Sequence, residues 1–184
     1  DPLMADLNVL AEQGNPSASL YLARIYLQKA ESRPNLQAAF EHLQRAIVLP
    51  EAKYRLGSLI LSGKLIDLPE QFTEQFAIDT IVEAGRALYL NAYGFLAEYF
   101  SDQQRYVYDP VYAKIFATVY IELGGFIDEQ RNFPALVNEL VLGDYDQKRV
   151  DDTVRRELTY GIEGWQPVAI SEKDLAMLLG ESWD

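Results

Sequence analysis

Residues 10–26, with the sequence LAEQGNPSASLYLARIY, indicate the end of one helix, a tight turn and the start of a second helix. Gly14 is suited to end the first helix, because glycine readily adopts the positive φ found there. Pro16 fits the first turn of the second helix, where its missing N–H is not needed. Ala18 and Leu22 then fall on one face of that helix. Neither helix can bury its apolar face alone, so we expect further helix pairs to stack on this hairpin.

The same pattern returns along the chain. Residues 52–60 form a second copy, in which Gly57 stands 34 residues after Ala23. Residues 89–97 form a third, degenerate copy, in which Gly94 follows 37 residues later. Helix pairs repeated at such intervals are typical of an α-solenoid. We therefore predict an all-α fold of stacked antiparallel helix hairpins.

Apolar spacing, glycines and prolines set the bounds of the individual helices. The predicted helices span residues 3–13, 16–29, 35–48, 51–62, 73–84, 86–100, 110–123, 133–142, 146–161 and 171–179. We predict a polar loop around Pro34 and a helix end at Gly85. Residues 1–125 are assigned to about three to four repeat units. Residues 126–184 are assigned to a C-terminal helical cap of the same domain, with Trp165 as its anchor and Trp183 left unassigned, because a solenoid end exposes an apolar face unless it is capped.

The first copy resembles the Sel-one-like repeat, a relative of the tetratricopeptide repeat. In that family a glycine ends the first helix, an alanine follows four residues later, and a Leu-Gly pair and a tyrosine come next. The residues that match are Gly14, Ala18, Leu22 and Tyr26. Ala23 replaces the glycine of the pair with another small residue.

The resemblance covers residues 3–125 and weakens along the chain. The second copy matches at Ala52, Leu56, Gly57 and Gly63, whereas the third has Tyr89 and Tyr93 at the alanine and leucine positions. The resemblance implies a non-catalytic scaffold or adaptor for protein–protein interaction. Several bacterial members are periplasmic or outer-membrane-associated assembly factors, some of them in exopolysaccharide export. On this ground alone, the periplasm or cell envelope is favoured over the cytoplasm.

The charge of the chain restricts its partners. The 184 residues include 28 acidic and 16 basic side chains, giving a net charge of -12. Nucleic acids and anionic membranes need a basic surface, so we expect neither as a partner. Another protein is expected, with a polysaccharide as the second candidate. No apolar run is long enough for a transmembrane helix, and no signal peptide is visible. Because the first residue is Asp1, we expect a processed chain that has lost its original start.

Residues that could carry chemistry are few. His42 is the only histidine, and we expect it to be a surface or half-buried side chain rather than a catalytic or zinc-binding one. An acidic cluster comprises Asp144, Asp146, Asp151 and Asp152. It lacks the glycine and glutamate of a calcium loop, so favourable charge at a helix N-terminus is the preferred interpretation. We predict no catalytic residue, no metal and no cofactor, while an enzyme that uses paired carboxylates stays open as a third class.

An aromatic region at residues 99–112 is the candidate partner-binding site. The residues concerned are Tyr99, Arg105, Tyr106, Tyr108 and Tyr112. Tyrosine and arginine are enriched at binding hot spots, and aromatic rings stack on peptides and sugars. The alternative, which we weight more heavily, is that these rings pack a long connection onto neighbouring helices.

Overall fold

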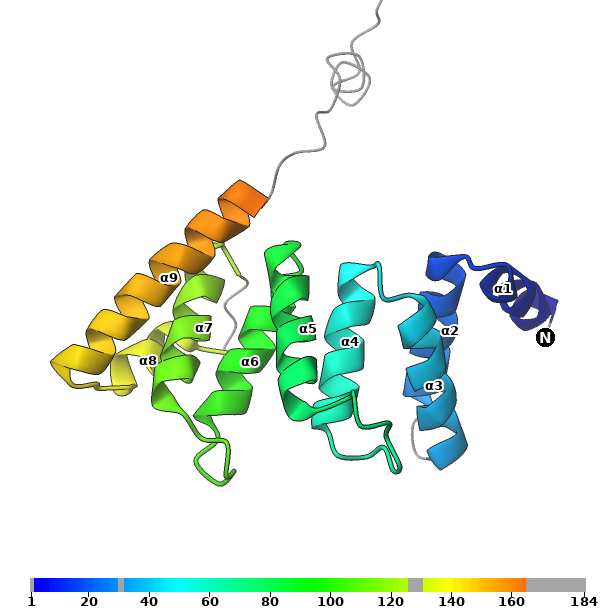
Figure 1. Ribbon diagram of the computed structural model, residues 1–184, viewed down its shortest axis with the longest axis horizontal. Helices are drawn as coiled ribbons and strands as arrows, with labels where there is room; N and C mark the ends of the chain where they lie inside the picture. Colours follow the sequence, from blue (N-terminus) through cyan, green and yellow to red (C-terminus); the bar gives the residue numbers. More distant parts are fainter. Residues whose placement is uncertain (1, 30–31, 126–130, 165–184) are drawn as a thin grey trace, which may run out of the picture.

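A computed structural model describes residues 2–29, 32–125 and 131–164. Their helices are α1 (Pro2–Glu12), α2 (Pro16–Gln28), α3 (Arg33–Arg45), α4 (Pro50–Leu61), α5 (Glu74–Arg86), α6 (Asn91–Ser101), α7 (Pro110–Glu122), α8 (Phe133–Glu139) and α9 (Asp144–Gly164). The helices stand side by side in one elongated row, from α1 at one end to α8 and α9 at the other (Figure 1). The described residues contain no strand. The predicted all-α solenoid is therefore confirmed.

The apolar core runs along the whole row. One cluster of buried side chains joins α2 to α5 and includes Leu43 and Leu56. A second cluster joins α5 to α9 and includes Leu96 and Val119. Helix α5 contributes to both clusters, because Ala77 lies in the first and Ile81, one turn further along the helix, lies in the second. Each helix thus buries its apolar side against its neighbours, as stacked repeats require.

Glycine allows two helices of this core to approach closely. A β-carbon added to Gly57 of α4 would lie 2.4 Å from Cγ1 of Ile81 and 2.7 Å from the carbonyl oxygen of Ala77, both on α5. Gly94 of α6 is less crowded, since its β-carbon would lie 3.3 Å from the ring of Tyr120. The small residue in the repeat pattern is therefore a packing requirement, and it is strictest in the second copy.

The predicted hairpin at residues 10–26 forms as expected. Gly14 has a φ of 86°, and the next N–H, that of Asn15, donates to the carbonyl of Leu10 at 3.0 Å. The Asn15 side chain then accepts hydrogen bonds from the N–H groups of Ser17 and Ala18, at 3.0 and 3.1 Å. These contacts satisfy backbone groups at both helix ends. A similar glycine end occurs at Gly124, with a φ of 81°.

The predicted helix end at Gly85 is wrong. Gly85 lies inside α5, and its β-carbon would lie 2.7 Å from the ring of Tyr93, so this glycine makes room for a large neighbour. The left-handed position is taken by Leu88, with a φ of 65°. Around it, Tyr89 N–H donates to the Ala84 carbonyl at 3.0 Å and Leu88 N–H donates to the Gly85 carbonyl at 2.9 Å, which is a Schellman motif without glycine. Helix α6 consequently begins at Asn91, five residues later than predicted.

Other predicted bounds also need correction. Arg33 and Pro34 do not lie in a loop but form the first turn of α3, a position where proline loses no hydrogen bond. Helix α3 then ends at Arg45 instead of residue 48. Helix α8 is three residues shorter than predicted, and α9 extends past both of its predicted ends. The predicted helix at residues 171–179 lies outside the described residues, as do both tryptophans.

His42 of α3 is expected to titrate below the usual histidine pKa of 6.5. Its ring stacks on Tyr26 of α2 with centroids 5.7 Å apart, and Nδ1 is buried without a hydrogen-bond partner among the described residues. Burial, reinforced by the nearby Arg45 guanidinium, lowers the pKa of His42. In the window between the lowered pKa and 6.5, the unfolded chain binds more protons than the folded one. The contribution of His42 to stability is therefore complete above this window and is lost as the pH falls through it.

Because the chain has one histidine, proton NMR follows this titration as a single set of imidazole resonances. The same titration of the urea-unfolded chain supplies the reference pKa, expected near about 6.5. A folded-state pKa equal to or above this reference would contradict the burial argument.

Candidate partner-binding groove

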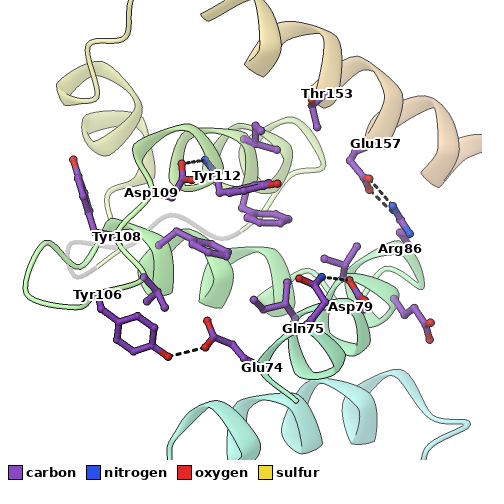
Figure 2. A pocket seen from close by; sticks show the side chains of 17 residues that line it. Glu74, Gln75, Asp79, Arg86, Tyr106, Tyr108, Asp109, Tyr112, Thr153 and Glu157 are labelled. Atoms are coloured by element: carbon purple, nitrogen blue, oxygen red, sulfur yellow. Dashed lines mark hydrogen bonds and ion pairs between the residues drawn. The ribbon is translucent and has the colours of Figure 1, made fainter. Parts of the chain in front are cut away.

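A groove of about 760 Å³ lies between α5, α7 and α9, with the loop that joins α6 to α7 along one edge (Figure 2). Its lining combines apolar, acidic and tyrosine side chains. Those residues are Glu74, Gln75, Ile78, Asp79, Val82, Glu83, Arg86, Phe100, Tyr106, Val107, Tyr108, Asp109, Tyr112, Ile115, Phe116, Thr153 and Glu157.

Helix α5 forms one wall of the groove. Its lining residues are adjacent pairs that repeat every four positions, so they cover one side of the helix along its length. Thr73 begins this helix and accepts the N–H of Phe76 at 3.1 Å, which fixes the first turn. Ile78 and Val82 are half-buried and supply apolar surface, while Glu74 and Asp79 supply charge. The wall is therefore amphipathic along its length.

The groove carries excess negative charge. Its lining includes five carboxylates and one cation, Arg86, which forms a two-point ion pair with Glu157 at 3.0 and 2.5 Å. Lys53 of α4 lies 2.5 Å from Glu83. Within the described part of the chain, no ion pair reaches the other three lining carboxylates, those of residues 74, 79 and 109.

Glu74 fastens the loop to α5. The hydroxyl of Tyr106 donates to Oε2 of Glu74 at 2.6 Å (Figure 2). The hydroxyl of Tyr99 donates to Oε1 of the same carboxylate at 3.4 Å. Burial, followed by the charge of Glu74, raises the pKa of Tyr99 to about 12. The hydrogen bond to Glu74 also raises the pKa of Tyr106. Both phenols therefore stay neutral donors at physiological pH.

The structure divides the aromatic region into two places. Tyr106, Tyr108 and Tyr112 line the groove, and 89%, 38% and 44% of their surfaces are exposed. Tyr99 is only 7% exposed, and the Arg105 guanidinium lies 5.4 Å above its ring. These last two residues line a separate cavity of about 330 Å³ between α4 and α6. The five predicted side chains therefore do not form one continuous surface.

The acidic cluster is spread along α9. Asp144 and Asp146 lie in its first turn, where negative charge is favourable. Asp151 accepts a hydrogen bond from Gln147 at 2.8 Å. Across the residues that the structure describes, no group of three or more histidine, aspartate or glutamate side chains is arranged to hold a metal ion. None of the described helices combines the length and apolar character needed to span a membrane.

Comparison with known proteins identifies the fold. No protein-family model matches the sequence, and no curated protein matches it. Among solved structures, it is similar to a protective antigen present in uropathogenic Escherichia coli strains that displays an SLR fold, with a TM-score of 0.65. The chain has the Sel-one-like repeat (SLR) fold. Sequence identity is 19%, and the match covers 98% of this chain but 36% of the antigen, so this chain spans well under half of that protein.

The groove of this SLR fold lies where the repeat pattern has decayed. Helices α5 and α6 correspond to the third, degenerate copy, and α7 follows that copy in the chain. In that copy Tyr93 is 1% exposed and stacks on Phe116 with centroids 6.2 Å apart, so Gly85 has compensated for a tyrosine at the leucine position. The SLR stacking therefore continues despite the larger side chains.

Sequence reasoning missed the acidic side of the groove. Glu74, Asp79 and Glu83 of α5 all line the groove, but a solvated helix carries the same kind of acidic residues. Glu157 is 71 residues from its partner Arg86, and no local signal links them. The groove could be found only after α9 had been placed against α5 and α7.

Proposed function

We propose that this SLR-fold chain is a non-catalytic scaffold that binds a segment of another protein in the groove between α5, α7 and α9. The groove itself carries the proposal, because it combines apolar side chains and exposed tyrosines in one concavity of about 760 Å³ with three carboxylates that form no ion pair within the described residues. Stacked helical repeats commonly bind partners on such concave surfaces. Within the described residues, the side chains that line the groove include no histidine, lysine or serine, which supports binding over catalysis.

The proposed setting is the bacterial cell envelope, with a role in assembly such as exopolysaccharide export. This part rests on the family resemblance of the repeats alone. The SLR fold supports the scaffold role.

A photo-crosslinking amino acid at Gln75, on the groove wall, is expected to capture the partner from extract of the source cells. The same amino acid at Asn138, an exposed residue of α8 outside the groove, is the matched control. The captured protein is identified by mass spectrometry, purified and titrated against the chain. We expect the purified protein to bind the chain, and to crosslink at Gln75 but not at Asn138. Turnover of a defined substrate without any such partner would overturn the scaffold proposal.

A polysaccharide is the second candidate ligand. It is favoured by the exposed rings of Tyr106, Tyr108 and Tyr112 along one edge of the groove, since aromatic faces stack on sugars.

If a glycan is bound there, Tyr106→Ala combined with Tyr108→Ala should abolish its signal on a glycan array. Tyr21→Ala is the control, because Tyr21 is also exposed, at 47%, but lies on α2. Equal glycan binding by the double variant would remove this candidate.

A further inference from the structure

We infer that the protein segment held in the groove is basic, with lysine or arginine side chains flanking an apolar residue. This inference rests on the proposed scaffold function and adds the chemistry of the partner. The inference follows from two features of the groove. Within the described residues, Glu74 and Asp79 of α5 form no ion pair, and apolar side chains of the groove are partly exposed.

The carboxylates of α5 favour a ligand with positively charged side chains. Asp79 accepts a hydrogen bond from Gln75 at 2.8 Å, and Glu74 accepts hydrogen bonds from two tyrosine hydroxyls. Within the described residues, neither carboxylate forms an ion pair. Both lie within a concavity, where low-dielectric walls focus the field of fixed charges. The net charge of -12 adds a long-range attraction for a cationic segment.

The apolar surface of the groove, on α5 and in the loop before α7, favours an apolar side chain in the ligand. Ile78, Val82 and Val107 are only half-buried and line the cavity. A small cation would neutralise the carboxylates but leave this surface in water, whereas a leucine or aromatic side chain would cover it. The exposed ring of Tyr106 adds a face on which a lysine or arginine head can rest. The two features together fit a basic segment with an apolar centre.

Fluorescence anisotropy of labelled synthetic peptides tests the inference with the full chain. The first peptide alternates arginine with leucine, the second replaces each arginine by glutamate, and the third replaces each leucine by serine. We expect the first to bind tightest, the third more weakly and the second not at all. Added salt should weaken the binding of the first peptide, because exposed charges are screened.

Two double variants separate the groove from overall charge. Glu74→Gln with Asp79→Asn should weaken the first peptide about tenfold. Glu12→Gln with Glu41→Gln removes the same two charges, from -12 to -10, at exposed positions of α1 and α3 and should change its affinity by less than about twofold. Circular dichroism checks that both variants stay folded. Equal weakening in both variants, or equal binding of the glutamate peptide, would overturn the inference.

The outcome also separates this inference from the scaffold proposal. A purified partner that crosslinks at Gln75 through a segment without positive charge would overturn the basic ligand and leave the scaffold function standing. Catalytic turnover without a partner would overturn both.

Discussion

Replacing Gly57 by valine is expected to lower the free energy of unfolding by about 3 kcal/mol. The added β-carbon alone would lie 2.7 Å from the backbone oxygen of Ala77 and 2.4 Å from the side chain of Ile81. A change of rotamer can move Ile81, but it cannot move a backbone carbonyl. Helices α4 and α5 must therefore separate, and the core cluster that joins α2 to α5 would lose contact.

Urea unfolding followed by circular dichroism measures this loss. Gly143→Val is the matched control, because a β-carbon at Gly143 meets nothing within 4 Å and the residue has no positive φ. The control should keep its stability within about 0.5 kcal/mol. Two variants with equal midpoints would show that the helices do not approach as closely as the structure indicates.

Replacing Val150 by aspartate is expected to destabilise the C-terminal end of the row by about 3–5 kcal/mol. Val150 lies on α9, is 2% exposed and belongs to the cluster that includes Val119 of α7. A carboxylate there would be buried without a cation. The result also tests the proposal that the segment from residue 126 onward caps the solenoid, since α9 detached from α7 would expose apolar surface.

Thermal unfolding and binding of a hydrophobic dye together measure both effects. The control is Thr159→Asp, which places the same charge at an exposed position of the same helix. We expect a lower melting temperature and greater dye binding for Val150→Asp only. Unchanged dye binding would count against a capping role for α9.

Local signals explain why much of the fold could be predicted. Gly14, Asn15 and Pro16 act within one turn of the chain, so the first hairpin is readable from sequence. The predicted helix end at Gly85 is wrong for an equally local reason. The left-handed position is taken by Leu88, and no sequence rule marks a non-glycine residue for that position. A glycine required for packing, such as Gly85, cannot be distinguished in the sequence from a glycine that ends a helix.

The candidate site was harder to predict, because it depends on the packing of distant segments. The aromatic region was found by its composition, but composition does not say which ring turns inward. Tyr99 follows the helical face of α6 into the core, whereas Tyr106 lies in the following loop and stays exposed. The carboxylates of α5 face the same groove only because α7 and α9 stand opposite them.

The ion pair between Arg86 and Glu157 links helices that are four places apart in chain order. In a row of stacked helices, each helix contacts mainly its neighbours, so separate parts of the row can unfold independently. We expect the direct contact between α5 and α9 to make the intervening helices open together with them. Hydrogen exchange should therefore report one cooperative unit for α5–α9, while the amides of α1 and α2 exchange through smaller, local openings.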